Sequence, residues 1–157
     1  MIILGIDPGF GRTGYAILEQ QKNQTVLRTC GCISTKTGEP MHLRLLEIAE
    51  DLEKIIKKWQ PDVACIESLF FTTNAKTAIT VGQARGVLLL TAAKNKLKII
   101  EVTPLQVKIS TTGYGKATKQ QVQRMIQTLL KLKKIPKPDD AADACAIAWA
   151  GMGRIKY

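Results

Sequence analysis

Four acidic side chains, far apart along the chain, have surroundings that suit metal-assisted chemistry. Asp7 follows the apolar run 2–6, and Glu67 ends a second such run that begins at residue 62. Short apolar runs bounded by turn residues are typical of buried strands. Neighbouring parallel strands lie about 4.8 Å apart, so these two carboxylates can share a cation if their strands are adjacent and parallel.

The second pair of acids opens an alanine-rich stretch, residues 139–150, that is predicted to be helical. A helix that is apolar on all sides is normally buried, and a lone buried carboxylate is costly unless it is paired or bound to metal. Asp143 therefore points to a function. Asp140 and Asp139 precede it by three and four residues, so each can share its helical face, and either can instead cap the helix. Spacing alone leaves both possibilities open.

Carboxylates as the only ligands select Mg²⁺ or Mn²⁺ rather than zinc. In two-metal phosphoryl transfer, ions about 3.5–4 Å apart flank the scissile phosphate; one activates a water and the other stabilises the leaving oxygen. We therefore predict that Asp7, Glu67 and Asp143 converge with a further aspartate on a site of this kind. The structural alternative for Asp7, which precedes Pro8 and Gly9, is the capping of a turn.

The charge of the chain favours a polyanionic partner. The formal net charge is +10, and the span from Lys94 to Lys137 holds eleven lysines and arginines but a single acid, Glu101. A one-sided excess of this size favours nucleic acid over a merely solvated basic face. Lys116, in a basic loop, and Arg85 are candidates for contacting DNA.

Length and composition set the remaining bounds. The 157 residues are expected to form one domain, 1–157, with a substantial core. No run reaches the length of a membrane span and no signal peptide opens the chain, so we expect a cytoplasmic protein with no membrane partner. The four cysteines, Cys30, Cys32, Cys65 and Cys145, lie in apolar surroundings without C-x-x-C spacing, so we expect buried free thiols rather than disulfides or a zinc site.

The elements that must position the acids follow from hydrophobic periodicity, which predicts an α/β fold whose first three strands form an antiparallel meander. The expected strands are 2–6, 14–19, 25–34, 62–67 and 98–102. The expected helices are 41–59, 75 to about 90, 105 to about 110, one opened by a capping box at 118–121, and the last from 139. In the capping-box helix we expect Met125 to face inward, and Lys119, Gln123 and Arg124 to face outward.

Two aromatic residues follow Glu67 on a loop that is expected to be exposed. Core packing can account for one of Phe70 and Phe71, while the other can stack on unpaired bases or wedge between them. The helix expected from residue 75 carries small residues at 81–86, which let a helix or a nucleic-acid backbone approach closely. Its apolar stretch 87–90 can serve the core and a subunit interface together.

Residues 9–14, Gly-Phe-Gly-Arg-Thr-Gly, match the dinucleotide-binding pattern G-x-G-x-x-G. That pattern requires a helix to begin inside it, so that the helix N-terminus meets the pyrophosphate. The following residues are instead typical of a second strand, which disfavours a nucleotide cofactor.

Taken together, these motifs resemble the RuvC family of Holliday-junction resolvases along essentially the whole chain. The residues that carry the resemblance are Gly5-Ile-Asp7-Pro-Gly9 with Thr13-Gly14, Ile66-Glu67, Asn74-Ala75 with Gly82-Gln-Ala-Arg-Gly86, Gln106-Val-Lys108, and Asp140-Ala-Ala-Asp143-Ala. The resemblance implies a ribonuclease H-like fold, a five-stranded mixed sheet with helices on both faces. It also implies a homodimer that nicks opposing strands of a four-way DNA junction symmetrically, in recombination and repair, leaving 5′-phosphates and 3′-hydroxyls.

The resemblance further implies roles for individual residues. The catalytic metal ligands for Mg²⁺, or Mn²⁺ in its place, would be Asp7, Glu67, Asp140 and Asp143, with Asp140 preferred over Asp139. Lys108 and Lys119 would contact the DNA backbone near the cut. Phe70 would be the base-stacking aromatic, with Phe71 as its substitute. A preference for short sequences at the cut and a branch-migration partner are implied in the same way.

Three other functions share parts of the pattern. An actin-like or sugar-kinase ATPase also opens with a strand, Gly-x-Asp and a glycine-rich turn, but needs a second lobe that this chain has no room for. A small nuclease acting on ribosomal-RNA precursors shares the early and late acids, whereas the segment 83–86 and the phenylalanine pair favour a junction enzyme. A non-enzymatic DNA-binding protein would explain the charge but not Asp143.

Overall fold

The computed structural model describes residues 1–22, 24–68 and 75–155, which form a mixed sheet with helices on both of its faces. The strands lie in the order β3-β2-β1-β4-β5. β1, β2 and β3 form an antiparallel meander, and β4 and β5 run parallel to β1. The predicted sheet is confirmed, with strand bounds of β1 (Ile2–Asp7), β2 (Arg12–Gln21), β3 (Gln24–Ser34), β4 (Val63–Glu67) and β5 (Lys98–Val102).

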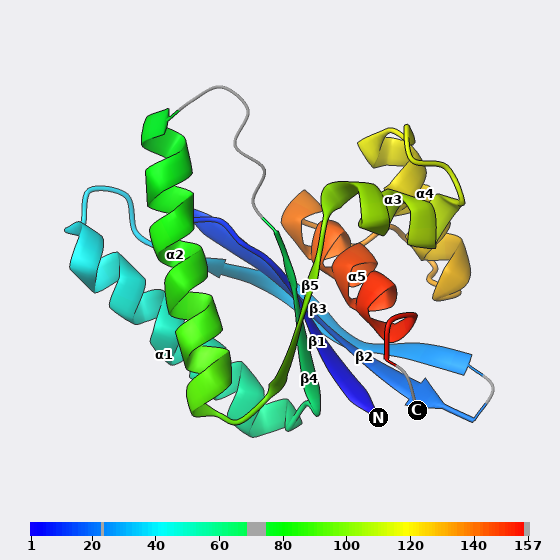
Figure 1. Ribbon diagram of the computed structural model, residues 1–157, viewed down its shortest axis with the longest axis horizontal. Helices are drawn as coiled ribbons and strands as arrows, with labels where there is room; N and C mark the ends of the chain where they lie inside the picture. Colours follow the sequence, from blue (N-terminus) through cyan, green and yellow to red (C-terminus); the bar gives the residue numbers. More distant parts are fainter. Residues whose placement is uncertain (23, 69–74, 156–157) are drawn as a thin grey trace.

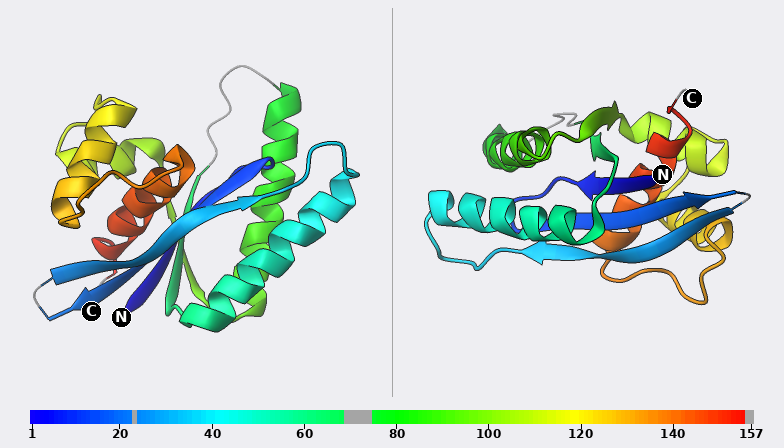
Figure 2. Two further views of the ribbon diagram at one scale, coloured as in Figure 1. Left: turned by 180° about the vertical axis from the view of Figure 1, so that it is seen from behind. Right: turned by 90° about the horizontal axis from the view of Figure 1, so that it is seen from below.

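Two groups of helices pack against the sheet, as Figures 1 and 2 show. One group is α1 (Met41–Trp59) with α2 (Ala75–Lys94), and the other is α5 (Asp139–Met152) with α3 (Pro104–Thr112) and α4 (Lys119–Leu129) beyond it. Along β1, Leu4 and Ile6 join the core under α1 and α2, while Ile3 joins the core under α5. Side chains alternate along a strand, so Asp7 emerges on the same face as Ile3, toward α5.

Close backbone contacts set α5 directly on the sheet. A β-carbon on Gly5 would lie 2.2 Å from the carbonyl oxygen of Ala144, and one on Gly14 would lie 2.0 Å from that of Asp140. Gly14 is also paired with Asp7 across β1 and β2. The absence of side chains at both glycines therefore lets the first turn of α5 reach the end of β1.

Several local predictions can now be compared with the structure. The periodicity of α1 is confirmed, with Ile48, Leu52 and Ile56 buried. The segment after Gly9 continues into β2 and not into a helix, which removes the basis of a dinucleotide site. Capping of α5 by Asp139 or Asp140 is wrong, because Pro138 is the N-cap and no side chain caps the helix.

The helix α4 begins with the predicted capping box, in which Thr118 and Gln121 exchange side-chain and backbone bonds. Two of its predicted orientations are wrong. Met125 is 36% exposed, whereas Gln123 is only 7% exposed and points into the protein. The face of α4 that packs against α5 is centred on Val122 and Ile126, which are buried. Gln123 lies on that face, and Met125 lies outside it. Polarity alone predicts that the Gln123 amide faces solvent, but this amide donates to Asp143.

Within the described part of the chain, no helix is both long and apolar enough to span a membrane. The four cysteines are free, as predicted. The expected burial is confirmed for Cys65 and Cys145 but is wrong for Cys30 and Cys32, which are partly exposed on β3.

Candidate active site

Three of the four predicted acids line one cavity of about 200 Å³ at the end of the sheet. Asp7 comes from β1, Glu67 from β4 and Asp143 from α5, and Lys108 and Lys119 complete its charged lining. The parallel pairing of β1 with β4 brings the first two acids to one edge of the sheet. Val63 and Cys65 of β4 pack in the core under α5, so alternation directs Glu67 to that side as well.

Asp7 lies in surroundings that disfavour its negative charge, first because it is buried and then because other carboxylates are near. Burial, together with the charges of Glu67, Asp143 and Asp140, raises the pKa of Asp7 to about 8, and the Lys119 ammonium only partly opposes this. Burial and the charge of Asp143 also raise the pKa of Glu67. The fold therefore places Asp7 where a negative charge is costly and where protein groups alone do not offset that cost.

Two residues of α4 contact different oxygens of Asp143. The Lys119 ammonium lies 2.6 Å from Oδ2, and the Gln123 amide donates to Oδ1 at 3.4 Å. The carboxylate is 24% exposed, so it is less buried than the alanine-rich sequence predicted. The hydrogen bond to Asp143 raises the pKa of Lys119, which keeps this lysine charged.

Asp140 lies beside the cavity rather than in its lining. Its Oδ2 is 3.3 Å from Nε of Arg12 and 3.8 Å from the thiol of Cys32. Asp139, in contrast, is 51% exposed and pairs with Lys137 at 2.8 Å. The charge of Asp140 contributes to the raised pKa of Asp7. Of the two adjacent aspartates, it is Asp140 that faces the other acids.

The residues present fit a hard divalent cation, which the RuvC resemblance implies. Among the described residues, no three His, Cys, Asp or Glu side chains are gathered closely enough to hold a metal ion in their present rotamers. Lys119 and Arg12 instead pair with Asp143 and Asp140. The donors are carboxylate oxygens, and burial together with the nearby acids raises the pKa of Asp7. Bound Mg²⁺ or Mn²⁺ would accept such oxygen ligands and offset the cost of charging Asp7.

The candidate DNA-binding residues have different environments. Lys108 and Lys119 lie at the cavity, and Lys116 is exposed on the loop before α4. Arg85 is 18% exposed on its side chain and forms an ion pair with Glu101. Its Nε also donates to the carbonyl oxygen of Glu67 at 3.2 Å, so Arg85 fixes the end of β4. Phe70, Phe71 and Asn74 lie outside the described residues.

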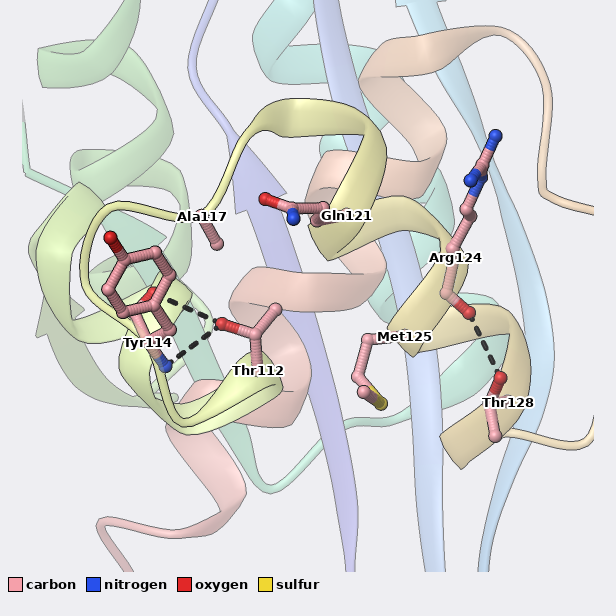
Figure 3. A pocket seen from close by; sticks show the side chains of 7 residues that line it. All are labelled: Thr112, Tyr114, Ala117, Gln121, Arg124, Met125 and Thr128. Atoms are coloured by element: carbon pink, nitrogen blue, oxygen red, sulfur yellow. Dashed lines mark hydrogen bonds between the residues drawn. The ribbon is translucent and has the colours of Figure 1, made fainter.

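A larger cavity of about 340 Å³ lies between the α3–α4 loop and the outer side of α4 (Figure 3). Its lining contains no carboxylate and includes the side chains of Tyr114 and Arg124. The hydroxyl of Thr112 closes the turn by accepting a bond from the backbone N–H of Tyr114 at 3.1 Å. Size alone does not identify an active site; the converging acids are in the smaller cavity.

Three residues near the acids were not predicted as part of the site. Arg12 and Cys32 contact Asp140, and Gln123 contacts Asp143. Gln123 follows Lys119 by one helical turn, so the two side chains share one face of the helix. This spacing could have indicated that Gln123 lies at the site together with Lys119. No sequence pattern could have placed Cys32 at the site, because its position depends on the pairing of β2 with β3.

Comparison with known proteins agrees with this geometry. A family model described as crossover junction endodeoxyribonuclease RuvC matches residues 3–150. The RuvC of Desulforamulus reducens is 50% identical over 163 residues, covering 99% of this chain and 100% of that protein. The RuvC of Caldicellulosiruptor saccharolyticus is 53% identical over 150 residues, covering 94% and 90% of the two chains.

Solved structures give the same result. Thermus thermophilus RuvC, in complex with a Holliday junction substrate, matches with a TM-score of 0.90 and 30% identity over 96% of this chain and 92% of that chain. The yeast mitochondrial Holliday junction resolvase Ydc2 shares the fold, with a TM-score of 0.70 at 15% identity over 96% and 77% of the chains. The ribonuclease H-like architecture is thereby confirmed, and the chain belongs to the RuvC family of crossover junction endodeoxyribonucleases.

Proposed function

We propose that this chain resolves four-way DNA junctions by metal-dependent hydrolysis of phosphodiester bonds, in homologous recombination and DNA repair. The observation that carries the proposal is the convergence of Asp7, Glu67 and Asp143 in one cavity, beside Lys108 and Lys119. Acids alone would repel DNA, and basic residues alone would bind it without chemistry. The T. thermophilus relative is bound to a Holliday junction substrate, which supports the same class of substrate here.

In this proposal Asp7, Glu67, Asp140 and Asp143 hold two Mg²⁺ ions, with Mn²⁺ able to replace them. When bound, such ions supply an activated water and stabilise the leaving oxygen. The lysines at the cavity bind the phosphates on either side of the cut, and Phe70 or Phe71 stacks on an unpaired base. Cleavage leaves a 5′-phosphate and a 3′-hydroxyl.

The proposed enzyme is one domain, residues 1–157, and acts as a homodimer, so that paired sites nick opposing strands symmetrically. Exposed apolar side chains support a subunit interface on α1 and α2: Leu43, Leu46, Ile79 and Leu90 are 45%, 53%, 65% and 61% exposed. Burying such side chains between two copies would remove apolar surface from water. A cytoplasmic location and cooperation with a branch-migration motor are parts of the same proposal.

The test compares a mobile four-way junction, a linear duplex and single-stranded RNA, each with Mg²⁺ or EDTA. We expect paired nicks in the junction only, and only with Mg²⁺. Asp7→Asn should bind the junction with unchanged affinity and lose cleavage by at least about 100-fold, because an amide cannot replace the ligand charge. Cleavage of the RNA alone would indicate a nuclease of ribosomal-RNA precursors. Normal resolution by Asp7→Asn would refute the proposed metal site.

A further inference from the structure

We infer that Gln123 is a positioning residue for Asp143, an inference that rests on the proposed function of the acid cluster. Five described polar residues are buried, and the other four are threonines: Thr13, Thr35, Thr91 and Thr111. A threonine hydroxyl is readily satisfied by a nearby carbonyl, as Thr111 is by Val107 at 2.8 Å. A buried amide is larger and costs more to desolvate, so its orientation requires an explanation.

The geometry supplies that explanation. Gln123 lies at 7% exposure among core residues of α4, and its amide nitrogen is directed to Oδ1 of Asp143. Lys119, one turn earlier, occupies Oδ2 of the same carboxylate. The two donors therefore hold both oxygens of Asp143 from one helix face, and each fixes a different edge of the carboxylate.

The two donors differ in what they can do when a metal ion and DNA bind. The Lys119 side chain is 54% exposed and charged, so it can move from Asp143 to a DNA phosphate. Gln123 is confined by the packing of Val122 and Ile126, and it is neutral. A neutral donor orients a carboxylate without cancelling the charge that attracts a cation. Gln123 thus keeps Asp143 in place in the state where Lys119 has left it.

A purely structural role for a buried amide is the competing explanation, and the chain offers a matched comparison. Gln127 lies one turn further along α4, and its amide donates to the carbonyl oxygen of Leu132 at 3.3 Å. Gln127→Met and Gln123→Met remove the same amide from the same helix, in the first case from a backbone carbonyl and in the second from a carboxylate. Only Gln123→Met removes a contact to an acid of the site.

The experiment measures Mn²⁺ and Mg²⁺ affinity by titration calorimetry on the DNA-free protein, with Asp143→Asn as a reference. We expect Gln123→Met to weaken metal binding by about 10-fold or more, and Gln127→Met by less than about 2-fold. Junction affinity in EDTA should be unchanged in both, while the single-turnover cleavage rate falls only for Gln123→Met. Gln123→Leu repeats the test with a second apolar side chain if the methionine variant does not fold.

Each outcome separates the inference from the proposed function. If Asp143→Asn binds metal as the unchanged protein does, the proposed metal site is wrong. If Asp143→Asn loses binding while Gln123→Met and Gln123→Leu keep it, the metal site stands and the positioning role is overturned. Equal weakening by the Gln123 and Gln127 variants would also overturn it, because the effect would then come from the packing of α4.

Discussion

Gly14 and Asp140 meet so closely that the carbonyl oxygen of Asp140 lies 2.0 Å from the place where a β-carbon of residue 14 would be. Gly14 is also the partner of Asp7 across the first two strands. This one contact seats α5 on the sheet beside the first acid of the site. The spacing of the acids thus depends on a residue that has no side chain.

Gly14→Ala should push the first turn of α5 off β2. We expect a loss of about 1–3 kcal/mol in the free energy of unfolding, measured by urea denaturation, together with reduced junction cleavage. Gly86→Ala is the control, because no residue that the structure describes lies within 4 Å of a β-carbon there. In a helix this change should stabilise the protein by up to about 1 kcal/mol. Unchanged stability of Gly14→Ala would show that α5 can move without cost.

The raised pKa of Asp7 predicts how stability depends on pH. In the metal-free protein Asp7 keeps its proton up to a pH of about 8, whereas in the unfolded chain it loses the proton near 3.8. The folded state binds more protons in this window, so the free energy of unfolding should fall as the pH rises from about 4 to about 8.

Asp7→Asn should remove most of this fall. At pH 8 in EDTA we expect the variant to be more stable than the unchanged protein by about 1–3 kcal/mol, measured by thermal and urea unfolding. At pH 4 the two should be alike, which is the internal control. Parallel pH profiles would mean that neither burial nor the neighbouring acids raise the pKa of Asp7.

The adjacent aspartates should respond differently to the same substitution. Asp140→Asn should reduce cleavage by at least about 10-fold, because Asp140 faces the other acids, whereas Asp139→Asn should leave cleavage within about 2-fold. Single-turnover cleavage of a labelled junction with Mg²⁺ measures both. Comparable losses of cleavage in the two variants would imply that Asp139 can take the place of Asp140.

Two basic residues should separate DNA contact from support of the site. Lys116→Gln should weaken junction binding, lower the slope of log affinity against log salt by about one, and leave stability unchanged. Arg85→Gln should keep the salt slope but lower stability by about 1–2 kcal/mol, because it loses its bonds to Glu101 and to the backbone of Glu67. A reduced slope for Arg85→Gln would restore its predicted role as a DNA contact.

Asp7, Glu67 and Asp143 were predictable from local rules, whereas the choice of Asp140 over Asp139 came from the family resemblance. Asp7 and Glu67 end apolar runs, and strand alternation together with parallel pairing then brings them together. The orientation of Gln123 and the engagement of Arg85 were not predictable, because both depend on how α4 and α2 are rotated against their neighbours. A polar side chain can be expected to face solvent only where it has no buried partner. A single sequence does not show which distant segments supply such partners.

The ion pairs of Lys119 with Asp143 and of Arg12 with Asp140 have a practical consequence. Two of the four carboxylates carry their own counter-ions, so the chain does not rely on a dissolved ion to keep its shape. A chelated preparation should remain folded on storage and hold its substrate intact. Adding divalent salt to the preassembled complex of protein and junction would then start cleavage in all molecules at the same time.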